Sequence, residues 1–377
     1  MAKKKYEPKT KEERDVKIKE YEQKIAEKFI KAIEEEQAPW QKPWDPNINA
    51  IDHNPTTDKT LPVEEQGYHG LNSMILEITR LLELHTDDPR WITSAQIWEL
   101  NQNKENQDNK IYIKKGEHAT TICKFVKTFF DKDKKPIKDP ELLTPENISF
   151  AKTGVRYFQV FNYSQLVRYK KDENGKSITD ENGNPVTEPA FDPPEKNTEK
   201  FKPRIAPEKL IKNTGAKIKH DQVDSCFYRE FDDTIHLVVP ERFKSQEDYY
   251  GTVLHELTHW TGAEKRLGRE EFKKYGENKE WRAKEELVAE IGSYLLSKKC
   301  RLTFEPRQDS KSYIQSWCKA IKDAPSAILN ATMNASVATN YIADFSRKER
   351  TVSLEKEAAR VEEGNLSLEK KTAGKKR

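Results

Sequence analysis

The chain has 377 residues, of which 35% are charged, with a net charge of +3 and a mean hydropathy of -0.97. No apolar run approaches the roughly 18 residues that a membrane helix needs, which excludes a membrane span. The first residues are charged, so no secretory signal is expected. The four cysteines form no CxxC pair and favour a reduced, cytoplasmic setting. The nearly balanced charge leaves nucleic-acid binding open, so such binding is expected only from a local basic surface.

The first part of the chain predicts an α+β domain over residues 1–169. Apolar side chains recur at helical spacing at Ile25, Phe29 and Ile33, until Pro39 ends the pattern. Thr93 or Ser94 is expected to cap a later short helix. In chain order, further helices are predicted over 71–84 and 93–98, and strands over 111–113, 120–130 and 157–163. The first two of these strands flank a turn that contains a glycine.

A polar segment over 170–207 separates this domain from the next one. Its two Asn-Gly pairs, its prolines and its many charges are typical of a linker or a long hairpin insert. The second domain is predicted over 208–346 as mostly helical with a small sheet. One of its strands lies over 231–240, with Ile235, Leu237 and Val239 facing inward, and ends at a proline. Residues 347–377 are predicted to be a charged tail.

The motif His255-Glu256-Leu257-Thr258-His259 carries the clearest chemistry. On a helix the two imidazoles share one face, about 6 Å apart, which suits two bonds to one zinc ion. Glu256 is angled towards the open coordination position, where it can take a proton from water and pass it to a leaving amine. The alternative is a helix whose two histidines are merely hydrogen-bonded within the fold. A chance match to HExxH in a chain of this composition has an expectation of only about 1–2%. The motif therefore predicts one zinc per chain.

A catalytic zinc ion needs a third protein ligand, and the helical segment 284–296 offers carboxylates. Glu286 and Glu290 lie four residues apart on one face, beside apolar Leu287 and Ile291. Burying two carboxylates there is costly without a cation or a hydrogen-bond donor. We therefore assign Glu286 as the third ligand and Glu290 as the acceptor that orients an imidazole. Glu285, about 100° away around the helix, and Glu290 remain alternatives for the ligand.

The chain resembles the ArdC-like antirestriction proteins, which join an N-terminal single-stranded-DNA-binding domain to a zincin-like metallopeptidase domain. The resemblance is most specific around the metal motif, at 260–262, 266–267 and 285–292. The shorter matches in the first part are 39–40, 43–44, 68–72, 91–93, 114–117 and 160–162. The charged segment after Phe130, the 170–207 segment and the tail depart from the family.

The resemblance implies that the first domain binds single-stranded DNA. The candidate contacts are Trp40, Trp44, Tyr68, Asn72, Trp91, Lys114, Lys115, Phe161 and Asn162. Aromatic rings that stack on bases beside lysines that bind phosphates are the usual equipment of sequence-tolerant single-strand binders. The alternative is that the tryptophans belong to the core and that the asparagines make turns and hydrogen bonds.

Two functions remain in competition. In the first, a DNA-binding module delivers a zinc peptidase to a protein substrate, such as a host restriction enzyme. In the second, the protein shields DNA and its zinc domain is a non-catalytic scaffold. The intact Glu256 favours the first, because a structural zinc needs no general base. Hydrolysis of phosphodiesters is disfavoured, since nucleases more usually use paired metals held by carboxylates.

Overall fold

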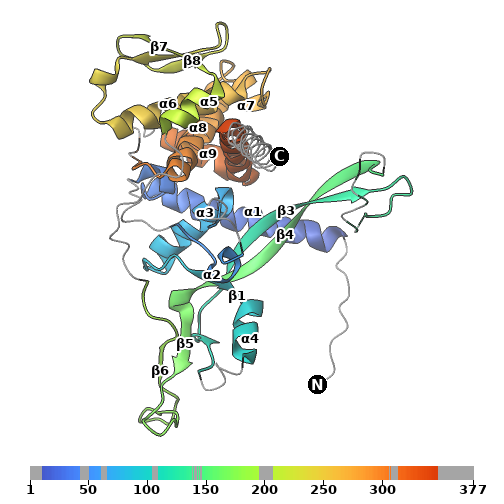
Figure 1. Cartoon of the computed structure of the whole chain (residues 1–377), viewed down its shortest axis with the longest axis vertical. Coiled ribbons are helices and arrows are strands. Elements are labelled where there is room, and N and C mark those ends of the chain that lie inside the picture. The colour runs from blue at the N-terminus through green and yellow to red at the C-terminus, as the bar shows by residue number, and fades with distance from the viewer. Residues whose placement is uncertain are drawn as a thin grey trace, which may run out of the picture. The chain divides into compact units, whose positions relative to one another are not determined.

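The computed structural model describes residues 11–42, 51–60, 66–103, 109–137, 139, 142, 144, 147–194, 207–304, 306 and 313–346. The chain forms two compact units (Figure 1): Met1–Asn49 with Thr198–Arg377, here called the metal unit, and Ala50–Asn197, the inserted unit. The domain limits expected from the sequence (1–169, 170–207, 208–346, 347–377) stay predictions, because a compact unit need not coincide with a sequence domain. None of the described helices is long and apolar enough to cross a membrane.

The metal unit consists of helices and one three-stranded sheet. Its helical segments are α1 (Lys11–Glu34), η1 (Pro39–Gln41), α5 (Pro207–Thr214), η7 (Pro240–Arg242), α6 (Gln246–Gly262), α7 (Glu270–Lys273), α8 (Lys279–Cys300), α9 (Ile314–Asp323) and a helix over 326–346. Its strands are β7 (Lys217–Gln222), β8 (Phe227–Arg229) and β9 (Thr234–Val238). β9 lies in the middle, parallel to β7 and antiparallel to β8.

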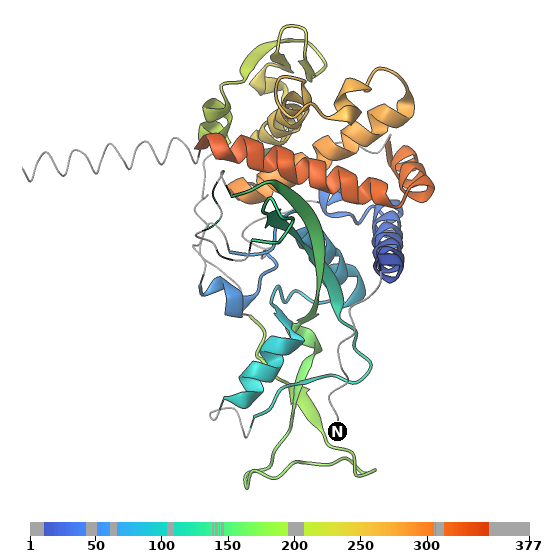
Figure 2. The same cartoon turned by 90° about the vertical axis from the view of Figure 1, so that its right-hand side faces the viewer.

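The core of the metal unit lies between this sheet and α6. Ile235 and Leu237 of β9 are fully buried, as predicted, and pack in one cluster with apolar residues of α6. Val239 was expected to face inward but is 39% exposed, because β9 ends at Val238 and a short 3-10 helix starts at Pro240. Near the end of α6, Trp260 contacts the Tyr341 and Phe345 rings of the helix over 326–346. Figure 2 shows this helix in orange-red beside other helices of the metal unit.

Helix α1 belongs to the metal unit, which the sequence did not indicate. Its predicted apolar face is buried at Ile25, Phe29 and Ile33. The helix packs against α9, and at its end Glu34 forms an ion pair of 2.8 Å with Lys322 of α9. The helical spacing therefore identified the buried face of α1 but not its partner.

The inserted unit is of the α+β type. Its helices are α2 (Pro55–Asp58), α3 (Gly70–Ile78) with its π-helical continuation η3 (Thr79–Glu83), and α4 (Ser94–Gln102). Its strands form two antiparallel sheets: β1 (Trp91–Thr93), β4 (Phe150–Asn162) and β3 (Thr120–Phe130) in one, and β2 (Tyr112–Ile113), β5 (Leu166–Tyr169) and β6 (Thr187–Pro189) in the other. Thr93 caps α4 through the Gln96 N–H, as expected. The two strands beside the glycine turn do not pair with each other, since β2 joins β5 and β3 joins β4.

The polar segment after Tyr169 begins as a hairpin. Isolated bridges join Lys171 to Ser177 and Thr179 to Pro185, before β6 pairs with β5. Beyond β6, Phe191 stacks on Tyr163 with ring centroids 4.4 Å apart. Residues 170–194 therefore belong to the inserted unit, and most of those before Ala190 are exposed.

Candidate metal centre

Helix α6 carries both histidines through the core of the metal unit. The helix begins because the Ser245 hydroxyl accepts a hydrogen bond of 3.1 Å from the Asp248 N–H. It ends at Gly262, where a Cβ would lie 2.8 Å from the Arg269 guanidinium. Every residue of α6 from Gly251 onward is buried. The imidazoles are thus held in a site that excludes most solvent.

Helix α8 brings the carboxylates to α6. The Asn278 side chain caps α8 by accepting hydrogen bonds from two N–H groups of its first turn. Farther along, Gly292 faces Thr258 of α6 so closely that a Cβ on Gly292 would lie 2.5 Å from Thr258 Cγ2. Gly292 is thus a small residue that lets the two helices approach closely. This close packing places the start of α8 beside the histidines.

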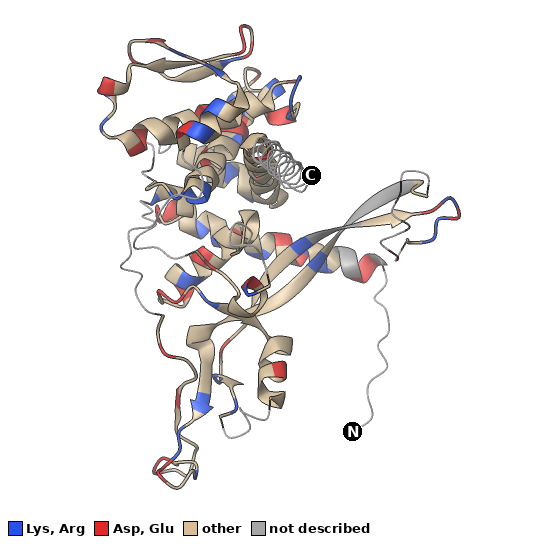
Figure 3. Ribbon diagram, viewed as in Figure 1, with Lys and Arg blue, Asp and Glu red and all other residues tan. Residues whose placement is uncertain are grey.

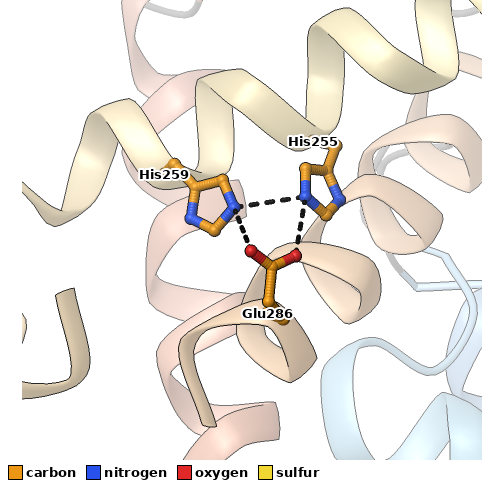
Figure 4. A group of neighbouring side chains, drawn as sticks. All are labelled: His255, His259 and Glu286. Atoms are coloured by element: carbon orange, nitrogen blue, oxygen red, sulfur yellow. Dashed lines mark hydrogen bonds and ion pairs between the residues drawn. The ribbon is translucent and has the colours of Figure 1, made fainter. Parts of the chain in front are cut away.

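His255, His259 and Glu286 converge on one point (Figure 4). Their potential ligand atoms all lie within 4.8 Å of one another, and all three residues are buried. Glu286 Oε2 lies 3.4 Å from His255 Nε2, and Glu286 Oε1 lies 3.7 Å from His259 Nε2. Of the described residues, these alone form a group able to hold a metal ion. Two imidazole nitrogens and one carboxylate fit a zinc ion that keeps a position open, and Glu286 is the carboxylate assigned from the sequence.

Glu285 has a part that the sequence did not assign to it. Its carboxylate is fully buried and accepts a hydrogen bond of 3.0 Å from His259 Nδ1. Arg269 donates to the same carboxylate through Nη2 at 2.5 Å and Nε at 3.1 Å. Burial disfavours the ionised carboxylate, but Arg269 and His259 outweigh it and hold the pKa of Glu285 below its usual range. Donation from Nδ1 leaves the His259 Nε2 lone pair available to a metal.

Three further contacts surround the metal ligands. Glu290 Oε1 lies 3.6 Å from His255 Nδ1, the kind of pairing that the sequence predicts for Glu290. Tyr275 donates its hydroxyl to Glu286 Oε1 at 2.5 Å. Glu256, which is buried, accepts a hydrogen bond of 2.9 Å from the Tyr228 N–H. Tyr228 lies on β8, whose three residues are too few to show a strand pattern in the sequence.

The predicted DNA contacts differ in exposure. Lys114 and Lys115 are exposed and Tyr68 is half-buried. Trp40, in the metal unit, and Trp91, in the inserted unit, are fully buried. Trp44 lies outside the described residues.

The remaining candidates make internal contacts. The Asn72 amide donates to the Cys123 carbonyl at 2.7 Å and accepts from the Cys123 N–H at 3.0 Å. Asn162 is fully buried and donates to the Asp88 carbonyl at 2.8 Å. Phe161 is also buried. Such contacts are typical of the structural interpretation that the sequence left open.

Comparisons with known proteins agree with this architecture. Residues 19–183 match the N-terminal domain of anti-restriction factor ArdC, and residues 206–334 match a zincin-like metallopeptidase. Two DNA primases TraC of Escherichia coli are 29% and 30% identical to the chain over 88% and 86% of its length. The chain spans only 28% and 20% of these primases.

Solved structures of the antirestriction ArdC protein from R388 plasmid match the fold. The metal-free form has a TM-score of 0.58 at 24% identity and covers 87% of this chain and 98% of that one. The Mn(II)-bound form has a TM-score of 0.55 at 25% identity and covers 86% and 97%. The chain therefore carries an ArdC N-terminal domain followed by a zincin-like metallopeptidase domain, and the second of these contains the His255, His259 and Glu286 metal site.

Proposed function

We propose that the protein binds single-stranded DNA and, at a zinc site, hydrolyses peptide bonds of a protein substrate. The position of Glu256 carries this proposal. Glu256 follows His255 in the chain without belonging to the donor set, and the Tyr228 N–H holds its carboxylate at 2.9 Å. A structural zinc ion is closed by four protein ligands and needs no neighbouring base. A buried glutamate beside three donors supports a catalytic site rather than a structural one.

Zinc is the proposed metal because of the donor chemistry. Imidazole ligands suit zinc, whereas manganese prefers oxygen ligands, and zinc binds a given site more tightly than manganese does. The existence of an Mn(II)-bound form of ArdC from R388 plasmid supports the binding of a divalent cation by this chain. When bound, zinc supplies a Lewis acid that strengthens water as a nucleophile and polarises the substrate carbonyl.

The side chains of the site divide the remaining work. Glu256 is the general base and then the acid that protonates the leaving amine. Its hydrogen bond to Tyr228 fixes the carboxylate, so that proton transfer starts from one geometry. Glu285 and Arg269 hold the His259 ring, and Tyr275 holds the Glu286 carboxylate. These contacts position the ligands and touch no substrate.

A polypeptide substrate is favoured by β8. This strand is at the edge of its sheet and packs on α6. The Tyr228 N–H points away from β9, since it bonds to Glu256. An extended peptide can lie along this edge beside the metal ligands and donate to the Tyr228 carbonyl, while the Tyr228 N–H stays with Glu256. A host restriction enzyme in the cytoplasm is the proposed substrate.

The DNA-binding part of the proposal rests on the ArdC N-terminal domain and on exposed lysines such as Lys114 and Lys115. The relatives named DNA primases support a function on DNA. We propose that the exposed members of the predicted set contact the DNA strand, while the buried Trp91, Phe161 and Asn162 support that surface from within the inserted unit. Trp40 packs on Phe29 in the metal unit and is not part of this surface.

The test compares the wild type with Glu256→Gln on a restriction enzyme and on casein, with and without single-stranded DNA. The variant is expected to keep its zinc and its DNA affinity. Its rate of proteolysis should fall by roughly 10²–10⁴-fold, the usual effect of removing a general base. Glu241→Gln, at an exposed carboxylate of η7, is the matched control and should cleave like the wild type. If the wild type cleaves neither protein and Glu256→Gln still protects cells from restriction, the shielding function is correct instead.

A further inference from the structure

The β3–β4 ribbon carries a surface that the metal site does not use. The two strands pair antiparallel along the whole of β3, and residues directly opposite each other share one face. On one face the ribbon starts in the core with Val160 and Ile122, which are buried. Phe158 lies opposite Ile122 and is 39% exposed. Next comes Lys124, opposite Arg156, and both are exposed. This face therefore changes from apolar to aromatic to basic within three rows.

The basic row is unfavourable unless an anion binds it. Like charges directly opposite each other destabilise a strand pair. Within the described part of the chain, no carboxylate forms an ion pair with Lys124 or Arg156. The two strands contain four lysines and arginines and no acidic residue. Figure 3 shows basic residues side by side on the ribbon. The charge of this face is complementary to a polyanion.

The exposed ring of Phe158 indicates which kind of polyanion fits this face. Rows on one face are two residues apart, about 7 Å along the strand, so the ring lies diagonal to Lys124, within reach of the same ligand. An exposed aromatic ring can stack on a nucleobase whose face is open. In a duplex the base faces are covered by stacking, and an acidic peptide offers no flat partner for the ring. The exposed ring of Phe158 and the two basic side chains together therefore fit a single-stranded nucleic acid.

We propose that Lys124, Arg156 and Phe158 form a clamp, here called the ribbon clamp, for single-stranded DNA. The two cations bind neighbouring backbone phosphates, and Phe158 stacks on a base between them. The arginine fork suits a phosphate oxygen pair, and the lysine acts as a point charge. The inference rests on the proposed DNA binding and assigns it a surface. Because stacking and phosphate contacts read no base edges, the clamp accepts any sequence.

The test measures binding of the full chain to a fluorescent 20-nucleotide oligothymidylate by anisotropy over a range of salt concentrations. Lys124→Gln with Arg156→Gln is expected to weaken binding and to make the slope of log K against log salt shallower by about 1.4, or about 0.7 per phosphate contact. Phe158→Ala is expected to weaken binding by about 5- to 150-fold and to leave this slope unchanged. Phe158→Tyr keeps the ring and should bind like the wild type.

The ribbon offers matched controls. Lys132→Gln with Lys135→Gln removes the same charge from exposed positions at the ribbon's end, and Val155→Ala trims an exposed side chain on its other face. Both should bind DNA like the wild type. The clamp is refuted if its variants keep the wild-type affinity and salt slope, or lose affinity equally for a 20-base-pair duplex. If either of these results refutes the ribbon clamp but the wild type binds the oligonucleotide, the protein still binds single-stranded DNA through another surface. If the wild type binds no oligonucleotide in low salt, both fail.

Discussion

Removing the Glu285 carboxylate should damage the fold and the metal site by separate routes. The side chains of Glu285 and Arg269 are 0% and 4% exposed, so their ion pair is out of contact with water. Glu285→Ala leaves the Arg269 guanidinium buried without its carboxylate. Breaking a buried pair from one side costs about 3–5 kcal/mol. For a unit of this size, that lowers the melting temperature by about 6–20 °C.

The second route runs through His259. Without Glu285, its Nδ1–H loses the acceptor that fixes both the ring orientation and the tautomer. Changes of this kind typically weaken metal binding by about 10–100-fold. The double variant Arg269→Met with Glu285→Leu separates the two effects, because it buries no unpaired charge but still leaves His259 without an acceptor. Its melting temperature should recover most of the loss, and its zinc affinity should not recover.

Melting is followed by circular dichroism on metal-free protein, because bound zinc would itself raise the melting temperature. Zinc affinity is measured by competition with a chelating dye. Glu280→Ala is the control, since Glu280 lies on the same helix and pairs with Lys284 at 2.6 Å at an exposed position. Solvent screening keeps such a pair at about 0–1 kcal/mol. Suppose that Glu285→Ala has the same melting temperature as Glu280→Ala and the zinc affinity of the wild type. Glu285 then neither stabilises the fold nor positions His259.

The other predictions concern packing and reactivity. Gly292→Ala should cost about 1–3 kcal/mol by forcing its Cβ onto Thr258, and Thr258→Ala in the same chain should recover part of the melting temperature. Burial raises the pKa of the Cys300 thiol to about 12, so a thiol reagent at pH 8 should modify half-buried Cys226 first and Cys300 only on unfolding; rapid modification of Cys300 would contradict this. Asn162→Ala should lower the melting temperature by removing buried hydrogen bonds worth about 1–3 kcal/mol, and a loss of DNA affinity without a loss of stability would instead show direct contact.

The metal ligands could be predicted because their signals are local. His255 and His259 are one helical turn apart, and the apolar neighbours of Glu286 marked its face as buried. Arg269 gave no such signal. It reaches Glu285 across 16 residues from the residue before α7, and helical periodicity does not determine where a side chain outside a helix points.

The same limit applies to the fold. Helical spacing identified the buried face of α1, and alternation identified Ile235 and Leu237 of β9 but was wrong for the exposed Val239. The partner of α1 depends on contacts between residues such as Glu34 and Lys322, which are 288 positions apart. β8 is too short for any pattern, so the residue that holds Glu256 was invisible in the sequence. Local order was thus predictable, and long-range pairing was not.

The division of the metal unit between the two ends of the chain has a consequence for its synthesis. Helix α1 leaves the ribosome before its partner helix α9, because Lys322 of α9 follows Glu34 by 288 residues. At a translation rate of roughly 5–20 residues per second, α9 is synthesised roughly 15 to 60 seconds after α1. During this time the apolar side chains of Ile25, Phe29 and Ile33 lack their native cover, while residues 50–197 are already complete. A nascent chain whose synthesis has not yet reached α9 therefore exposes the apolar face of α1, and we expect chaperones to bind this face.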